Sequence, residues 1–272
     1  IERHRATIHY GVPTLFVTEL NVQRVSPRDV SSLRRGLVAG APVSDALIRQ
    51  VEEELCPDLQ VGYSLTECGS TVSLTRPGQS KEKQHFTVGQ PIDGTEVKIL
   101  DAEGVELPVE SVGEICVRGP GVMKGYYRQP RETSNWFDEE GFFRTGDLGI
   151  VDDEGFLHLV GRRKEVIIRS GFSVYPQEVE IRISAHPAVR EAAVVGIPDD
   201  VLGEAICACV VPVEGAIVTD QEIRNWSLVT LAEYKVPDVV RFWDELPLTG
   251  TGKVRRVEIS RLIREASGGT AD

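Results

Sequence analysis

Four short segments of this sequence combine glycine with hydroxyl, carboxylate, guanidinium or ammonium side chains. In chain order they are 62–67 (Gly-Tyr-Ser-Leu-Thr-Glu), 143–149 (Phe-Arg-Thr-Gly-Asp-Leu-Gly), 161–165 (Gly-Arg-Arg-Lys-Glu) and 247–253 (Pro-Leu-Thr-Gly-Thr-Gly-Lys). A fifth segment, 170–176 (Ser-Gly-Phe-Ser-Val-Tyr-Pro), lies between the last two. These groups donate and accept hydrogen bonds and carry both signs of charge, so together they can bind a polar, charged ligand.

Taken one at a time, the same residues have structural explanations. Tyr63 can be a half-buried core residue, and Asp147 can cap a turn. Lys253 alone would be a solvated surface residue. It is not the lysine of a nucleotide-binding P-loop, because Pro247 stands where that motif needs glycine and Val254 where it needs Ser or Thr.

The elements that must position these segments begin with alternating strands and helices over residues 1–88. Residues 6–22 predict a short strand, a Gly-Val-Pro turn and an amphipathic helix, and 33–39 predict a second strand. Ser44 is the expected N-cap of a helix with apolar residues at helical spacing, and 59–62 predict a buried third strand. This alternation predicts a parallel sheet with helices on its faces.

The pattern changes at residue 89 and again near residue 163. Short strands between glycine and proline turns are predicted at 97–100, 113–118 and 156–160. This pattern is typical of a small antiparallel β-barrel or sandwich. After residue 163, strands and helices form a unit of about 100 residues, the size of an independent domain. The expected fold class is therefore α/β followed by α+β. The expected domains are 1–163 (sheet portion 1–88, β-barrel-like portion 89–163) and a small α+β domain at 164–272.

Composition narrows the classes of partner. The chain has 272 residues, 41% of them hydrophobic, and a formal net charge of −12. This acidic balance disfavours nucleic acids and anionic membranes as partners. No apolar run approaches the roughly 18 residues of a membrane-spanning helix, so we expect no membrane span. The five cysteines are odd in number and irregularly spaced, which fits reduced thiols in a cytoplasmic protein. Cys207 and Cys209 share one face of a predicted strand but have no second ligand pair, so we expect no metal site there.

The histidines and the aromatic pair Trp136-Phe137 are expected to be structural. The five histidines have no serine or cysteine partner in a hydrolase arrangement. His158 alternates within a predicted strand, and His85 follows a Lys-Glu-Lys run and is expected to be exposed. Trp136 and Phe137 are expected to fill the core of the β-barrel-like portion.

The order and the gaps of the five segments closely resemble the adenylate-forming superfamily, which includes acyl-CoA synthetases, peptide-synthetase adenylation domains and luciferases. The resemblance runs from about residue 6 to residue 262. It implies part of a large adenylate-forming domain followed by a mobile carboxy-terminal domain. It also implies an enzyme that activates a small-molecule carboxylic acid with ATP and Mg²⁺ and joins it to coenzyme A. A homodimer is compatible with it.

The resemblance assigns one group of residues to the nucleoside. The ring of Tyr63 would pack on adenine, which supplies contact area and stacking. The turn Gly40, Ala41 and Pro42 would lie along the adenine and the acyl pocket, where small residues permit close approach. Asp147 would accept hydrogen bonds from both ribose hydroxyls with its two carboxylate oxygens.

A second group would act on the phosphates. Thr66 would offer its hydroxyl to the α-phosphate, and Glu67 would supply the hard oxygen ligand that Mg²⁺ prefers. Arg162 resembles an arginine that reaches the nucleotide sugar or phosphate. Lys253 resembles the catalytic lysine that stabilises charge as the carboxylate attacks the α-phosphate.

The resemblance also implies a change of conformation between two half-reactions. Lys164 matches the hinge residue about which the small domain swings once the adenylate has formed. The swing would withdraw Lys253 and bring the loop with Gly171 and Phe172 to the pantetheine tunnel.

One part of the family pattern is missing. Residues 1–61 contain no Ser/Thr/Gly-rich loop of the kind that grips the β- and γ-phosphates, and the sequence begins with Ile1. The resemblance therefore implies a carboxy-terminal fragment, which we expect to be inactive in adenylation by itself.

The acid is less well defined. The sequence looks most like medium- or long-chain fatty acyl-CoA synthetases in three segments, 10–16, 39–42 and 171–176, although Ser173 replaces the common Asn. An aryl-CoA ligase is the alternative within the class. A peptide-synthetase adenylation domain is disfavoured because no carrier domain follows. A non-catalytic remnant that binds nucleotide remains open as a different class.

Overall fold

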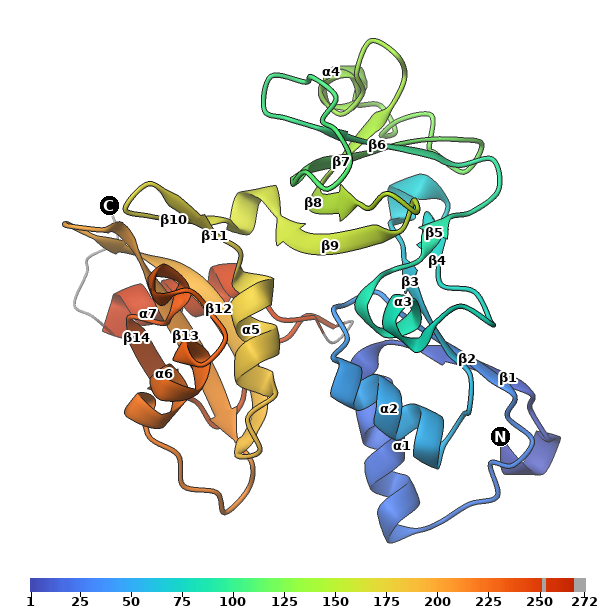
Figure 1. Ribbon diagram of the computed structural model, residues 1–272, viewed down its shortest axis with the longest axis vertical. Helices are drawn as coiled ribbons and strands as arrows, with labels where there is room; N and C mark the ends of the chain where they lie inside the picture. Colours follow the sequence, from blue (N-terminus) through green and yellow to red (C-terminus); the bar gives the residue numbers. More distant parts are fainter. Residues whose placement is uncertain (251–252, 267–272) are drawn as a thin grey trace. The chain divides into compact units, whose positions relative to one another are not determined.

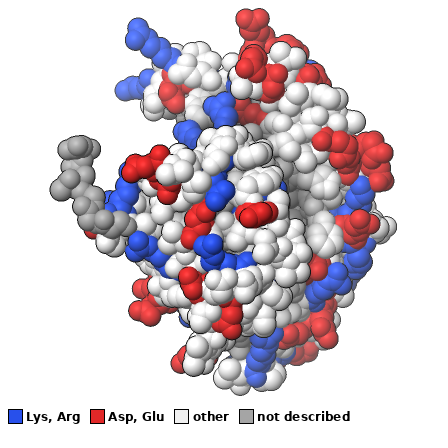
Figure 2. All heavy atoms as spheres, turned by 60° about the vertical axis from the view of Figure 1, so that its left-hand side comes forward, with Lys and Arg blue, Asp and Glu red and all other residues white. Residues whose placement is uncertain are grey.

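The computed structural model describes residues 1–250 and 253–266, which divide into two compact units, Ile1–Val160 and Gly161–Asp272 (Figure 1). Thr251 and Gly252 of the 247–253 segment lie outside the described residues. Among the described residues, no helix combines the length and the apolar character that crossing a membrane requires. Figure 2 shows acidic and basic side chains intermingled on one face.

The first unit opens with the predicted alternation of strands and helices. Its five-stranded sheet has the order β1-β2-β3-β4-β5, and the first three strands are parallel. The strands are β1 (Ile8–Gly11), β2 (Arg35–Ala39), β3 (Leu59–Tyr63), β4 (Ser73–Leu74) and β5 (Gln90–Pro91). The sequence did not predict the short strands β4 and β5, which pair antiparallel to β3 and to each other.

Three helices accompany this sheet: α1 (Pro13–Val25), α2 (Asp45–Glu54) and α3 (Lys81–Phe86). Ser44 caps α2 as expected, because its hydroxyl accepts a hydrogen bond from the N–H of Leu47. Phe16 and Leu20 of α1 and Ile48 of α2 are buried in one core with the sheet. A 3₁₀ turn, η1 (Glu2–His4), precedes β1.

His85 is buried, so the prediction that it would be exposed is wrong. It is 6% exposed at the end of α3, and its ring nitrogens contact Asp45 Oδ1 at 2.7 Å and Glu52 Oε2 at 3.2 Å. Both carboxylates belong to α2. A buried imidazole is stable here because acidic partners far away in the sequence satisfy both of its nitrogens.

Residues 96–162, for which the sequence predicts a small β-barrel or sandwich, form a four-stranded sheet with the order β6-β7-β8-β9 that does not close into a barrel. Its strands are β6 (Glu96–Leu100), β7 (Gly113–Arg118), β8 (Phe143–Val151) and β9 (Leu157–Arg162), and α4 (Pro130–Asn135) precedes β8. Four strands are too few to curl into a barrel that encloses its own core. Trp136 and Phe137 instead pack beside Phe143, partly buried against the core that the first unit shares.

The second unit is an α+β layer structure. Its sheet has the order β11-β10-β13-β12, and β14 pairs in parallel with β13. The strands are β10 (Ile167–Arg169), β11 (Phe172–Val174), β12 (Val189–Asp199), β13 (Gly203–Pro212) and β14 (Val239–Phe242). The helices are α5 (Pro176–Ser184), α6 (Asp220–Leu228) and α7 (Arg256–Ala266), with 3₁₀ turns η3 (Arg163–Glu165) and η4 (Glu233–Lys235).

Alternate side chains of β12 and β13 build two apolar layers in this unit. One layer includes Val194 and Ile206 and packs against Val179 of α5 and Ile223 of α6. The residues between them face the other way and pack with α7; this layer includes Cys207 and Cys209, both fully buried. The period of two along each strand thus places helices on both faces of the sheet.

Candidate functional site

Tyr63 and Asp147 come together although they are 84 residues apart. The O–H of Tyr63, at the end of β3, donates to Oδ2 of Asp147 in β8 at 2.7 Å. The two residues are 5% and 7% exposed. Burial, followed by the neighbouring Asp147 carboxylate, raises the pKa of the Tyr63 phenol. The phenol therefore remains a hydrogen-bond donor to Asp147, whose carboxylate oxygens each carry more than one acceptor position.

The end of β3 lies beside the end of β2. The two strands are parallel and pair Ala39 with Gly62, so both chains leave the sheet at the same edge. Gly40, with φ at 87°, begins the turn after β2, and the exposed Ala41 and Pro42 continue it. Ligand sites of parallel sheets lie at this carboxyl edge. The structure thus gathers the predicted turn 40–42 next to Tyr63.

Thr66 and Glu67 open the 3₁₀ turn η2 (Thr66–Cys68) just beyond the same edge. Oε1 of Glu67 accepts a hydrogen bond from the Tyr126 hydroxyl at 3.2 Å, and the Glu67 carbonyl accepts one from Met123 N–H at 2.7 Å. Burial, followed by the Glu67 carboxylate, raises the pKa of Tyr126. The phenol is therefore a protonated donor that helps to hold the carboxylate in place.

No cluster of three or more His, Cys, Asp or Glu side chains that could hold a metal ion occurs in the described parts of the chain. At nucleotide sites Mg²⁺ usually takes one or two carboxylates together with phosphate oxygens and water. Glu67 fits such an ion as a single hard oxygen ligand.

A bulge in β8 carries Asp147. The pairing of β7 with β8 shifts between Glu114, opposite Leu148, and Cys116, opposite Arg144. Residues 145–147 of β8 therefore face Ile115 alone, and such bulges re-aim side chains next to functional sites. Thr145 closes the bulge, because its hydroxyl donates to the Ile115 carbonyl at 2.8 Å and accepts from the Asp147 N–H at 3.1 Å.

The other predicted residues belong to the second unit. Arg162 ends β9, and Lys164 lies in η3 with its side chain exposed. Gly171, with φ at 83°, turns the chain between β10 and β11. Phe172 follows it, is 54% exposed, and stacks on Tyr234 with ring centroids 4.8 Å apart.

Lys253 bonds to Thr249 within the second unit. Its backbone N–H donates to the Thr249 hydroxyl at 3.0 Å, and its carbonyl accepts from the Thr249 N–H at 2.7 Å. The adjacent pair Leu248 and Val254 forms an antiparallel bridge. The backbone of this lysine is therefore fixed while its side chain projects into solvent.

Sequence reasoning missed three residues that contact the predicted site: Tyr126, Tyr234 and Glu114. Glu114 gave a signal, because it is an acidic residue inside the otherwise apolar run Gly-Glu-Ile-Cys-Val of a predicted strand. A carboxylate in such a place needs a buried partner. Neither tyrosine had a comparable signal, since each depends on a contact made by the fold.

Comparison with known proteins gave matches along most of the chain. A family model described as AMP-binding enzyme matches residues 1–127, and a model described as AMP-binding enzyme C-terminal domain matches residues 178–253. A mitochondrial medium-chain acyl-CoA ligase of Macaca fascicularis, ACSF2, is 36% identical over 261 residues. That match covers 95% of this chain but 42% of the ligase, so the chain spans less than half the length of this relative.

Solved structures gave the same result. The ATP-bound MatB of Rhodopseudomonas palustris matches with a TM-score of 0.89 and 32% identity, over 97% of this chain and 52% of that one. The anthranilate CoA ligase AuaEII in complex with anthranoyl-AMP matches with a TM-score of 0.88 and 29% identity, over 98% of this chain and 52% of that one.

Proposed function

This chain belongs to the family of AMP-binding enzymes, and we propose that it is part of an ATP-dependent acid–CoA ligase. In the first half-reaction a carboxylate oxygen attacks the α-phosphorus of ATP, and the bond to the leaving pyrophosphate breaks. In the second, the thiol sulfur of coenzyme A attacks the acyl carbon, loses its proton and displaces AMP.

One observation carries this proposal: the Tyr63–Asp147 pair lies at the sheet edge where Thr66 and Glu67 begin. A carboxylate that accepts from one hydroxyl and is fixed by it can accept from the hydroxyls of a ribose as well. A hydroxyl and a second carboxylate follow within four residues, where the phosphates of the same nucleotide would extend.

In the first half-reaction the residues of the first unit hold the nucleotide. Asp147 accepts from the ribose hydroxyls, and the turn 40–42 with Tyr63 lies along the adenine. Thr66 donates to the α-phosphate. Glu67 would hold Mg²⁺, which would neutralise phosphate charge when bound.

The second unit supplies the group that acts on the reacting atoms. Two anions meet when a carboxylate approaches the α-phosphate, and charge accumulates on the phosphate oxygens. The Lys253 ammonium stabilises that charge, a contribution of about 3 kcal/mol for a well-placed donor. Arg162 reaches the nucleotide from the strand that leads into this unit.

The second half-reaction uses another face of the same unit. Rotation about Lys164 removes Lys253 and brings Gly171 and Phe172 to the channel for coenzyme A. An exposed residue in a short 3₁₀ turn suits this hinge, because changing its backbone angles breaks little packing.

A medium- or long-chain fatty acid is the proposed substrate class, supported by the medium-chain acyl-CoA ligase among the relatives. An aryl acid is the second candidate, because the anthranilate CoA ligase matches with nearly the same TM-score as MatB.

The test is an assay of the full-length protein that contains this chain, with ATP, Mg²⁺, coenzyme A and a panel of acids from butyrate to stearate and benzoate to anthranilate. We expect AMP and acyl-CoA to appear in equal amounts with fatty acids. Turnover of the aromatic acids alone would support the second candidate. AMP without a thioester would contradict the CoA ligase, and no AMP with any acid would favour a nucleotide-binding remnant.

A further inference from the structure

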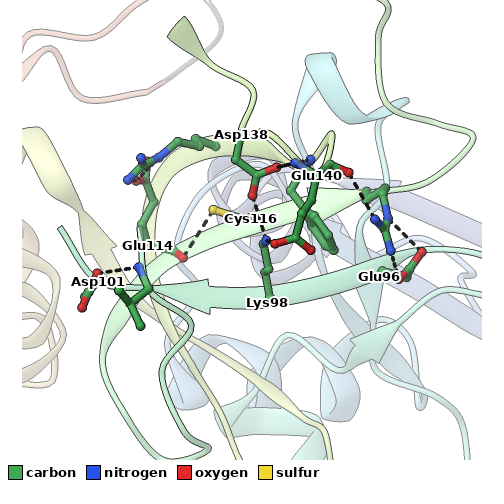
Figure 3. A network of polar contacts seen from close by, with 11 residues as sticks. Glu96, Lys98, Asp101, Glu114, Cys116, Asp138 and Glu140 are labelled. Atoms are coloured by element: carbon green, nitrogen blue, oxygen red, sulfur yellow. Dashed lines mark hydrogen bonds and ion pairs between the residues drawn. The ribbon is translucent and has the colours of Figure 1, made fainter. Parts of the chain in front are cut away.

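Glu114 is an almost fully buried carboxylate in the four-stranded sheet. It is 2% exposed on β7. Oε2 accepts from Arg144 Nε at 2.8 Å and from Nη2 at 2.6 Å, and Oε1 accepts from the Gly146 N–H at 3.1 Å. Figure 3 shows Glu114 beside Cys116, whose Sγ contacts the Glu114 carbonyl, to one side of the cluster around Lys98. Arg144 and Gly146, which donate to this carboxylate, both lie just before Asp147 on β8.

The hydrogen bonds of Glu114 replace backbone hydrogen bonds between β7 and β8 that are lost at the bulge. Residues 145–147 cannot all pair with Ile115, so at least one backbone N–H needs another acceptor. The Gly146 N–H finds it in Glu114, while Gly146 adopts φ at 72°, a conformation that suits glycine. Arg144 holds the carboxylate in turn, because two of its N–H groups donate charge-assisted hydrogen bonds to Oε2.

A second buried charge in the same sheet has no such connection. Lys98 of β6 is 8% exposed and pairs with Asp138 at 2.8 Å and Glu140 at 3.2 Å (Figure 3). Those bonds tie a strand to the loop after α4 and touch none of the predicted site residues. Glu114 therefore differs from an ordinary structural ion pair in what it holds.

We propose that Glu114 is a positioning residue for Asp147 and thereby sets the preference of the site for a nucleotide with ribose hydroxyls. The inference rests on the proposed function, which assigns Asp147 to the ribose. With the bulge held on both sides, by Thr145 and by Glu114, the Asp147 carboxylate has one orientation. Without Glu114, the Gly146 peptide can rotate, and the carboxylate loses its fixed direction while the rest of the nucleotide site stays in place.

The test compares the affinities of full-length protein for ATP and for 2′,3′-dideoxy-ATP, measured by titration calorimetry. We expect the wild type to prefer ATP and Asp147→Ala to lose that preference. Glu114→Gln should lower the preference for ATP over 2′,3′-dideoxy-ATP roughly tenfold, because it weakens the affinity for ATP and leaves the affinity for 2′,3′-dideoxy-ATP unchanged. In an Asp147→Ala background, Glu114→Gln should have no further effect on the preference, because the two act through one contact.

Two further variants keep the test decisive. Arg144→Lys retains a cation beside Glu114 but loses the two guanidinium N–H donors, so we expect an intermediate loss of the preference for ATP. This variant can be measured even if Glu114→Gln folds poorly. Glu96→Gln, which breaks the exposed pair with Arg118 in the same sheet, should leave the preference unchanged.

Equal weakening for both nucleotides in Glu114→Gln and Arg144→Lys would overturn the inference and leave Glu114 a structural residue. A preference unaffected by Asp147→Ala would overturn the ribose assignment of the proposed function, and this inference with it.

Discussion

The two units hold their predicted site residues in different ways. In the first, Tyr63 and Asp147 are 5% and 7% exposed and bonded to each other. In the second, Phe172 is 54% exposed, and Lys253 is exposed and bonded to Thr249 through its backbone. Buried, bonded groups keep one geometry for a ligand that stays in place. Exposed groups exchange partners at little cost in packing, as a moving catalytic element must.

This difference divides the proposed reaction between the units. The first unit would bind one nucleotide in a fixed pose through both half-reactions. The second would present first Lys253 and then Phe172 to that nucleotide. Each of the following substitutions changes either the nucleotide-binding first unit or the catalytic groups of the second unit.

The largest effect is expected from Lys253→Ala. Adenylate formation should slow roughly a hundred- to a thousandfold, the usual loss when a donor to transition-state charge is removed. Thioester formation from supplied acyl-adenylate should keep its rate, and separate rate measurements on the two half-reactions would check this. Arg261→Ala, which breaks exposed ion pairs on α7, is the control and should leave both rates nearly unchanged. Equal losses in both half-reactions would contradict the division between the units.

Asp152 tests whether the framework of the first unit depends on fixed charges. Burial alone would raise its pKa, but bonds from Lys83, Phe156 N–H and His158 outweigh it and lower the pKa of this carboxyl to about 2. Because the pKa of Asp152 is lower in the folded protein than its ordinary value of 3.8, the ionised carboxylate stabilises the fold at pH values above 3.8. This contribution is lost as the pH falls towards 2. Asp152→Asn should therefore cost about 2 kcal/mol at neutral pH and less in acid.

Hydrogen exchange in the first unit, measured against pH, would detect that loss. The adjacent, exposed Asp153 offers the matched control, and Asp153→Asn should change little. A penalty for Asp152→Asn that stays constant from neutral pH down to pH 2 would show that the ion pair is not its source.

Tyr63→Phe should have a smaller effect on the first unit. It removes the donor to Asp147 Oδ2 but keeps the ring, so affinity for ATP should fall by a factor of about five, or about 1 kcal/mol. Calorimetric titration with ATP would measure it. Tyr126→Phe is the companion variant, which frees Glu67 and should weaken binding of ATP with Mg²⁺ more than without it. Unchanged affinity in Tyr63→Phe would mean that Asp147 needs no fixing by this tyrosine.

The smallest effect is expected from Tyr234→Ala in the second unit. Loss of the stacked partner of Phe172 removes about 0.5–1.5 kcal/mol of ring contact and should slow thioester formation several-fold with adenylation unchanged. Tyr234→Phe keeps the ring and should restore the rate. Slower adenylation in Tyr234→Ala would break the assignment of this face to the second half-reaction.

The sequence predicted the elements whose patterns are local. Strands β1 to β3 and helix α2, with its Ser44 cap, follow from apolar spacing and capping chemistry alone. Strand β8 was not predicted as a strand, because its segment 143–149 contains two glycines, a threonine and two charged residues. Those residues build the bulge at Asp147, and a bulge breaks the alternation from which strands are recognised.

Contacts between distant residues account for the rest. His85 is buried only because Asp45 and Glu52 meet it from another helix. Tyr126 contacts the site residue Glu67, 59 positions away, and Glu114 contacts Gly146, the neighbour of Asp147, 32 positions away. No local pattern in the sequence indicates these contacts. For a similar reason the sequence did not show that the strands of the predicted barrel or sandwich form a sheet that stays open, since strand spacing does not indicate whether the edge strands β6 and β9 pair.

The most direct test of the account is a crystal structure of the full-length protein with a non-hydrolysable acyl-adenylate analogue. We predict both ribose hydroxyls within about 3 Å of the Asp147 carboxylate, with Tyr63 still bonded to it and the turn 40–42 along the adenine. An adenylate whose ribose lies away from Asp147 would contradict the central claim.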